Sequence, residues 1–196
     1  MSDIKSAREI AMEKVEKLGE ATQEERLTWK YVPQGEGLAV RYLKENLNLV
    51  VELNHFEGEV RKYIIEGAAQ VLTQNISLPR NDIAKKNNRR VMDGLKLLKS
   101  DKVSVENVFS KIRYLFNHYA EQGEQQRQKA YQSLKTEMEA QVQQALQQQL
   151  GTLMGVKIDV ERQPQFQQEW RKIQTQLDSQ YLTHLNEYKR ELLNTK

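Results

Sequence analysis

The chain has 196 residues, of which 38% are hydrophobic and 29% charged, and its formal net charge is +3. The absence of cysteine excludes disulfides, thiolate zinc sites, iron–sulfur clusters and a cysteine nucleophile. Three prolines and nine glycines are too few for a Pro/Gly-rich linker or for a sandwich of many strands joined by tight turns.

The N-terminal part predicts two amphipathic helices. Apolar residues recur every three or four positions over residues 4–18, as on one face of a helix. Thr22 and Glu25 then form a capping box that starts a second, short helix. We expect that helix to end near Tyr31, because Pro33 disfavours helical backbone at the residue before it.

The middle of the chain is also predicted to be helical. Residues 38–75 are the most apolar part and fit two buried helices, although 47–53 could instead form a strand, since valine favours sheets. A basic helix follows over residues 82–99. Ser104 should cap the next helix and Gly123 should end it.

After residue 123 the composition changes. Glutamines dominate up to residue 149, and a long apolar stripe at helical spacing begins after Pro164, which suits the first position of a helix. Because only a short connection joins these two long helices, they should lie antiparallel. We therefore predict an all-α protein, with a body of about five helices over residues 1–122 and a coiled-coil-like antiparallel hairpin arm over residues 123–196.

The sequence predicts no catalytic, cofactor-binding or metal-binding residue. Glu52 and His55 have the E-x-x-H spacing of helical di-iron proteins. Such sites need a second copy of the motif, and neither His118 nor His184 follows a glutamate by three residues. Nucleophile–base pairs and phosphate-binding glycine loops are also missing, so we expect a protein without enzymatic activity.

The predicted basic helix is the first candidate for a binding surface. Residues 79–103 hold eight basic and three acidic residues, which makes this segment the source of the positive net charge. Asparagines between the cations could bind bases or phosphate oxygens. The face could meet nucleic acid, an acidic protein or only solvent. Its candidate ligands are Lys85, Lys86, Arg89, Arg90, Lys96 and Lys99.

The connection between the two arm helices is the second candidate. Several apolar residues lie at this expected tip, where no core need reach, and an exposed apolar patch usually contacts something. The contact could be a second copy of the arm, the body of the same chain or a different protein. The residues are Leu150, Leu153, Met154, Val156, Ile158 and Val160.

These features predict a cytoplasmic protein that does not enter a membrane. The N-terminus lacks an apolar signal-peptide core, and the longest nearly apolar stretch, residues 47–53, is far shorter than the roughly 20 residues of a membrane span. We expect an interaction or assembly protein, an adaptor or scaffold that self-associates through the arm tip. The alternative is a nucleic-acid- or ribosome-associated factor that binds phosphate through helix 82–99.

Overall fold

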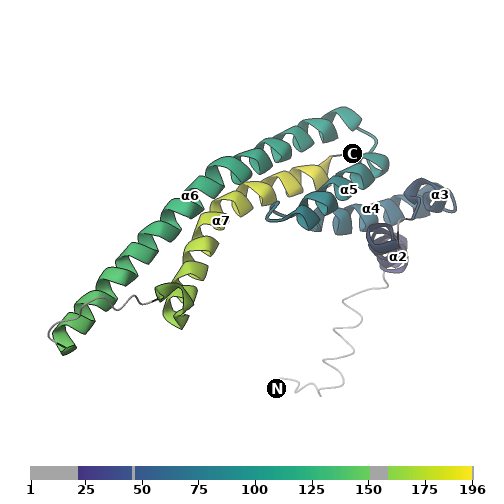
Figure 1. Ribbon diagram of the computed structural model, residues 1–196. Helices are drawn as coiled ribbons and strands as arrows, with labels where there is room; N and C mark the ends of the chain where they lie inside the picture. Colours follow the sequence, from purple (N-terminus) through teal and green to yellow (C-terminus); the bar gives the residue numbers. More distant parts are fainter. Residues whose placement is uncertain (1–21, 46, 151–158, 196) are drawn as a thin grey trace, which may run out of the picture. The chain divides into compact units, whose positions relative to one another are not determined.

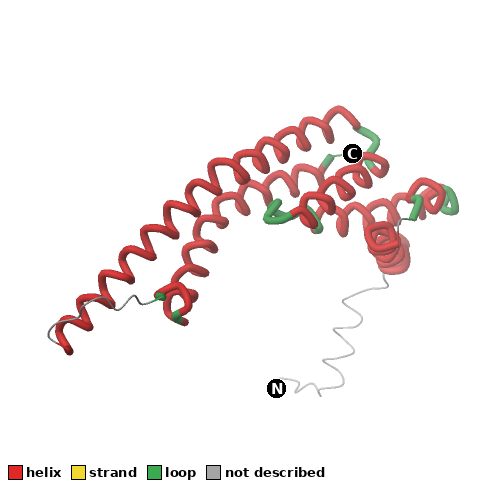
Figure 2. Tube along the Cα trace, viewed as in Figure 1, coloured by secondary structure: helices red, strands yellow, loops and turns green. Residues whose placement is uncertain are grey.

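A computed structural model describes residues 22–45, 47–150 and 159–195, except for the side chains of residues 149 and 150. All regular elements in these ranges are helices (Figure 1, Figure 2). They are α2 (Gln23–Glu45), α3 (Leu49–Leu53), α4 (Gly58–Gln74), α5 (Asp82–Leu98), α6 (Lys102–Leu150), the 3-10 turn η1 (Val160–Arg162) and α7 (Pro164–Asn194). The predicted all-α class is confirmed. The strand alternative for residues 47–53 is wrong, because α3 occupies most of that segment.

The chain divides into two compact units, residues 1–72 and residues 73–196. The first unit holds α2, α3 and nearly all of α4, and the second holds α5, α6, η1 and α7. The expected boundary between residues 122 and 123 falls inside α6, where the helix is continuous. None of the described helices combines the length and the apolar character needed to cross a bilayer.

Helix α2 begins at the predicted capping box but does not end where we expected. The backbone N–H of Thr22 donates to Glu25 Oε2 at 2.8 Å, and that of Glu25 donates to Thr22 Oγ1 at 3.2 Å. The predicted end near Tyr31 is wrong, because α2 continues through Pro33 to Glu45. Pro33 has no N–H to donate to the carbonyl of Trp29, four residues earlier. Both residues are exposed, so water can bind that carbonyl instead.

Helices α2 and α4 touch through their backbones at two glycines. A Cβ atom on Gly35 would lie 2.1 Å from the carbonyl oxygen of Ile64, and one on Gly67 would lie 2.1 Å from that of Val32. Both distances are far shorter than any van der Waals contact, so only glycine fits at these positions. Gly35 therefore serves helix packing inside α2, beyond the point near Tyr31 where we expected this helix to end.

Helix α6 is one continuous helix of 49 residues. Asp101, and not the expected Ser104, caps it: the Asp101 carboxylate accepts hydrogen bonds from Ser104 N at 3.0 Å and from Ser104 Oγ at 2.6 Å. The predicted end at Gly123 is wrong as well. A Cβ there would lie 3.2 Å from the hydroxyl oxygen of Tyr181, so this glycine makes room for α7.

Helix α7 packs antiparallel against α6 (Figure 1). The contacting residues show the antiparallel direction, because residue numbers rise along α6 as those of their partners fall. The pairs are Lys111 with Glu191, His118 with Tyr181, and Lys135 with Glu161 of η1. α7 therefore lies along α6 on both sides of Gly123. Part of its contact surface comes from residues that the sequence had assigned to the body.

An aromatic and aliphatic cluster holds the N-terminal end of α7 and η1 on α6. Its buried members are Leu134, Met138, Val160 and Phe166. Tyr131 packs edge-on against Phe166, with ring centroids 5.3 Å apart, and against Trp170 at 5.1 Å. The aromatic residues that recur at helical spacing on α7 thus belong to the core of this unit.

Candidate functional site

Helix α5 carries the predicted basic surface and is anchored by its asparagines. Asn81 caps the helix by accepting from Ala84 N at 2.8 Å. The Asn88 side chain is buried, accepts from Ser77 N at 2.9 Å and donates to Ser77 O at 2.6 Å. Asn87 donates to the carbonyl of Asn75. The loop before α5 thus uses the amide group of Asn88 and one donor of Asn87, the two asparagines between the cations that we expected to be available for bases or phosphate oxygens.

The six predicted cations of α5 do not form one free surface. Lys99 donates to the carbonyl oxygens of Leu193 and Thr195, at 3.1 and 2.7 Å, and so caps the C-terminal end of α7. Burial lowers the pKa of Lys99. Two of the other five form ion pairs, Lys85 with Asp82 and Lys96 with Glu106. Arg90 is half-buried and interacts with other residues of the chain. Lys86 and Arg89 are exposed and have no ion pair to another described residue.

A groove of about 500 Å³ lies between α5 and α6. Its floor is apolar and includes Met92, Phe109 and Phe116, of which Phe109 is buried and Phe116 half-buried. Four cationic side chains and two acidic ones line it: Lys85, Arg89, Lys96 and Arg113, with Asp93 and Glu106. The groove therefore combines an apolar floor with a net positive rim. Lys85, Arg89 and Lys96 are the predicted patch residues that line it.

Glu106 neutralises only part of this rim. Its carboxylate accepts from Arg113 Nη2 at 2.6 Å and from Lys96 Nζ at 3.2 Å. These two hydrogen bonds, the one from Arg113 above all, lower the pKa of Glu106. One negative charge is thus shared by two cations, and the residues that line the groove keep a net positive charge.

Most of the predicted apolar tip lies outside the described residues. This holds for Leu153, Met154, Val156 and Ile158, and the side chain of Leu150 is likewise not described. Val160 differs from the expectation. It is buried against Leu134 and Phe166, because η1 turns it onto α6, so its apolar surface is used inside the chain.

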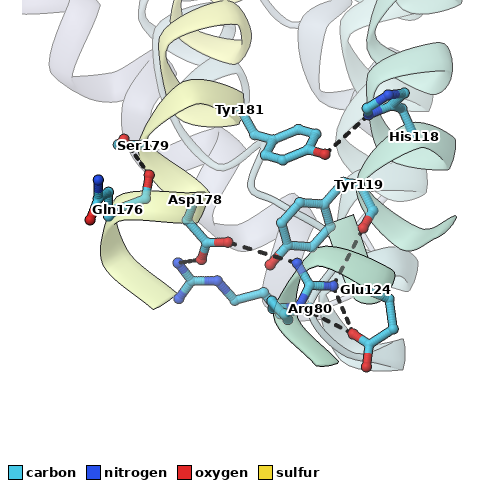
Figure 3. Close-up of polar contacts among 9 residues, drawn as sticks. Arg80, His118, Tyr119, Glu124, Gln176, Asp178, Ser179 and Tyr181 are labelled. Carbon is cyan, nitrogen blue, oxygen red and sulfur yellow. Dashed lines mark hydrogen bonds and ion pairs between the residues drawn. The ribbon is translucent and has the colours of Figure 1, made fainter. Parts of the chain in front are cut away.

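An ion cluster around the buried carboxylate of Asp178 joins α6, α7 and the loop before α5 (Figure 3). Asp178 of α7 is buried, and its Oδ2 accepts from Arg80 Nη2 at 2.6 Å. Arg127 Nη1 lies 4.0 Å from the other carboxylate oxygen. The Arg127 guanidinium also stacks on Tyr119, 4.4 Å from the ring centroid, and donates to Glu124 at 2.8 Å. The cluster ties three segments together far from either end of α7.

Two tyrosines complete the cluster. His118 Nδ1 and the Tyr181 hydroxyl lie within hydrogen-bond distance, at 3.0 Å. Burial and the negative charge of Asp178 raise the pKa of Tyr119, and burial is also the main cause of the raised pKa of Tyr181. Both phenols therefore keep their protons at neutral pH. Asp178 was not among the predicted site residues, although it is a charged residue three positions before Tyr181 on the apolar stripe of α7.

The E-x-x-H pair is not arranged as in a helical metal site. Glu52 belongs to α3, whereas His55 lies beyond the end of that helix and is exposed. The Glu52 carboxylate lies 4.0 Å from Arg41. Within the described part of the chain, no group of three or more histidine, aspartate or glutamate side chains could hold a metal ion.

Comparison with known proteins assigns the chain to a family. A family model matches residues 50–194, well over half of the chain, and is described as a family of unknown function, DUF6657. The chain belongs to DUF6657. The matched region runs from α3 through α7 and leaves out α2. No curated protein and no solved structure matches the chain.

The two features of the second unit lie inside the DUF6657 region. The groove is built by residues 79–120, and the ion cluster by side chains from Arg80 to Tyr181. The DUF6657 description assigns no activity, so the function of this member has to be argued from the chemistry of its surfaces.

Proposed function

We propose that this chain is a non-enzymatic interaction protein that holds an acidic, amphipathic segment of a protein partner in the groove between α5 and α6. The observation that carries the proposal is the composition of the groove, an apolar floor under a net positive rim. An amphipathic segment would bury its apolar side chains on Met92, Phe109 and Phe116, and its carboxylates would meet Arg89 and Arg113.

A polypeptide fits this groove better than nucleic acid does. A phosphate backbone uses cations but leaves apolar surface such as Phe109 and Met92 without a partner. Asn87 and Asn88, the expected hydrogen-bond donors to bases, bind the 75–77 loop instead, and Lys99 binds the end of α7. Some of the side chains expected to bind nucleic acid are therefore used within the chain. The apolar floor of the groove, by contrast, supports an acidic and partly apolar protein partner.

The test is selection of peptides from a random display library on the intact chain, with counter-selection on a Phe116→Asp variant. We expect the enriched peptides to be amphipathic helices, with large apolar residues every three or four positions on one face and acidic residues beside them. Fluorescence anisotropy should then show binding that weakens about tenfold in Arg89→Glu. Arg89 has no ion pair to another described residue, so this change should leave the fold intact.

The control is Lys172→Glu, which makes the same charge reversal on α7, outside the groove. Its affinity for the selected peptides should stay within about twofold of wild type. Three results would contradict the proposal: enriched peptides without acidic residues, equal loss of affinity in both variants, and displacement of the peptides by short RNA or DNA duplexes at equal charge concentration.

A second candidate is self-association through the C-terminal end of α6. Among the described residues, Val142 is the last on α6 that packs on the aromatic cluster, and the helix continues to Leu150. Leu146, one turn beyond Val142, is half-buried, and its position extends the same stripe. A second copy would present an identical stripe, so two such ends could pair.

Sedimentation velocity tests this second candidate. We expect a dimer or higher oligomer for wild type, dissociation in Leu146→Asp, and no change in Gln144→Asp, which adds the same charge at an exposed position. A wild-type monomer at the highest concentration reached would overturn it, whatever the outcome for the groove.

A further inference from the structure

A second pocket, distinct from the groove, opens between α6, α7 and the loop that leads into α5. Its volume is about 540 Å³. It adjoins the groove, with which it shares Pro79, Lys85 and Ala120, but its other walls come from α7 and from the middle of α6. The ion cluster of Figure 3 forms one side of it.

Cations from four segments of the chain line this pocket. They are Arg80 of the loop, Lys85 of α5, Arg127 of α6 and Arg171 of α7, and they face two acidic residues, Glu124 and Asp178. The pocket thus carries a net positive charge on walls that surround one space. An arrangement of this kind attracts an anion and brings guanidinium groups to it from more than one side.

The arginines are held in place before any ligand arrives. Arg127 is anchored by Glu124 at 2.8 Å, and only 15% of its side chain is exposed. Arg80 uses one nitrogen on Asp178 while 60% of its side chain remains exposed. Arg171 donates from Nε to the carbonyl of Gln167 at 3.1 Å, and neither of its terminal amino groups has a partner within the described ranges, so both can bind a ligand. Preorganised donors lose little conformational entropy on binding.

We propose that this pocket binds a small polyanion, a molecule with two or more phosphate or carboxylate groups. A single small oxyanion would fill only a fraction of 540 Å³, whereas a molecule with two or more anionic groups can bind several of the four cations that line the pocket. The neutral polar side chains of Gln174 and Thr175 on α7 add hydrogen-bonding groups beside Arg171. Ala120 and Leu182 leave room for an apolar part of the same molecule.

Isothermal titration calorimetry with pyrophosphate and with citrate tests the proposal on the full chain, at an ionic strength held constant with sodium chloride. We expect saturable binding of one molecule per chain for at least one of the two probes. Tighter binding of pyrophosphate would identify phosphates as the preferred groups, and tighter binding of citrate would identify carboxylates.

Neighbouring residues on α7 supply the matched variants. Arg171→Gln should weaken binding about tenfold, as expected for the loss of a charge-assisted hydrogen bond. Lys172→Gln removes the same charge one position away, outside the pocket, and should leave the affinity unchanged. Circular dichroism checks that both variants stay folded. Absence of saturable binding for both probes, or equal weakening in both variants, would overturn the proposal.

Discussion

The α2–α4 crossing and the α6–α7 pair bury helix surfaces with opposite kinds of residue. At the crossing, Gly35 and Gly67 bring two backbones into direct contact. Along α6 and α7, rings such as Phe166 and the buried carboxylate of Asp178 fill a wider space. A backbone contact cannot adjust to an added atom, whereas long side chains can change rotamer or shift slightly. The first unit should therefore tolerate substitution less well at its contact points than the second.

The largest effect should come from Gly35→Ala or Gly67→Ala. Each added methyl group would meet a backbone carbonyl oxygen that cannot move without shifting its helix. We expect the first unit to lose about 3 kcal/mol or more of stability. Hydrogen exchange of the backbone amides of α2 and α4 would measure this loss of stability.

Gly37→Ala is the matched control, because a Cβ there meets nothing within 4 Å. In the interior of a helix, alanine should stabilise α2 by up to about 1 kcal/mol relative to glycine. If all three variants behaved alike, the backbone contact would not be what holds the two helices together.

In the second unit, Phe166→Ala should cost about 3–4 kcal/mol, because Phe166 is fully buried among Leu134, Met138 and Val160. Urea denaturation followed by circular dichroism would measure the loss. Leu182→Ala, at a position with 38% exposure on the same helix, should cost less than about 1 kcal/mol. Similar losses in the two variants would mean that the cluster does not anchor α7.

Asp178→Asn should cost about 2–3 kcal/mol, because it removes the charge-assisted hydrogen bond of 2.6 Å that the buried Asp178 carboxylate accepts from Arg80. The same denaturation assay applies. Glu187→Gln removes an exposed carboxylate from α7 and should change stability by less than about 0.5 kcal/mol. If Asp178→Asn left the free energy of unfolding unchanged, the ion cluster would contribute no net stability.

The smallest effect concerns Glu106, whose pKa in the folded chain is lowered, first by Arg113 and then by Lys96. A carboxyl group with a lowered pKa stabilises the fold above its unfolded pKa of about 4.3, and this contribution is lost as the pH falls through the folded pKa. Because 42% of the side chain is exposed, the contribution should stay below about 1 kcal/mol. Carboxyl NMR titration should show the pKa of Glu106 rising in Arg113→Gln, and rising less in Lys96→Gln.

Local patterns were sufficient for the helical class, for the capping box at Thr22 and for the start of α7 at Pro164. Helical periodicity and capping involve residues only three or four positions apart, so a single segment contains all the information they need. The basic character of residues 79–103 is likewise a property of composition.

The paths of α2 through Pro33 and of α6 through Gly123 depended on contacts from distant parts of the chain. Local propensity disfavours both, but packing against α4 and against Tyr181 outweighs a preference of about 1–3 kcal/mol. The same holds for the burial of Asp178 by Arg80, a partner 98 positions away. Such choices follow from which surfaces meet in three dimensions, and no short stretch of sequence contains that information.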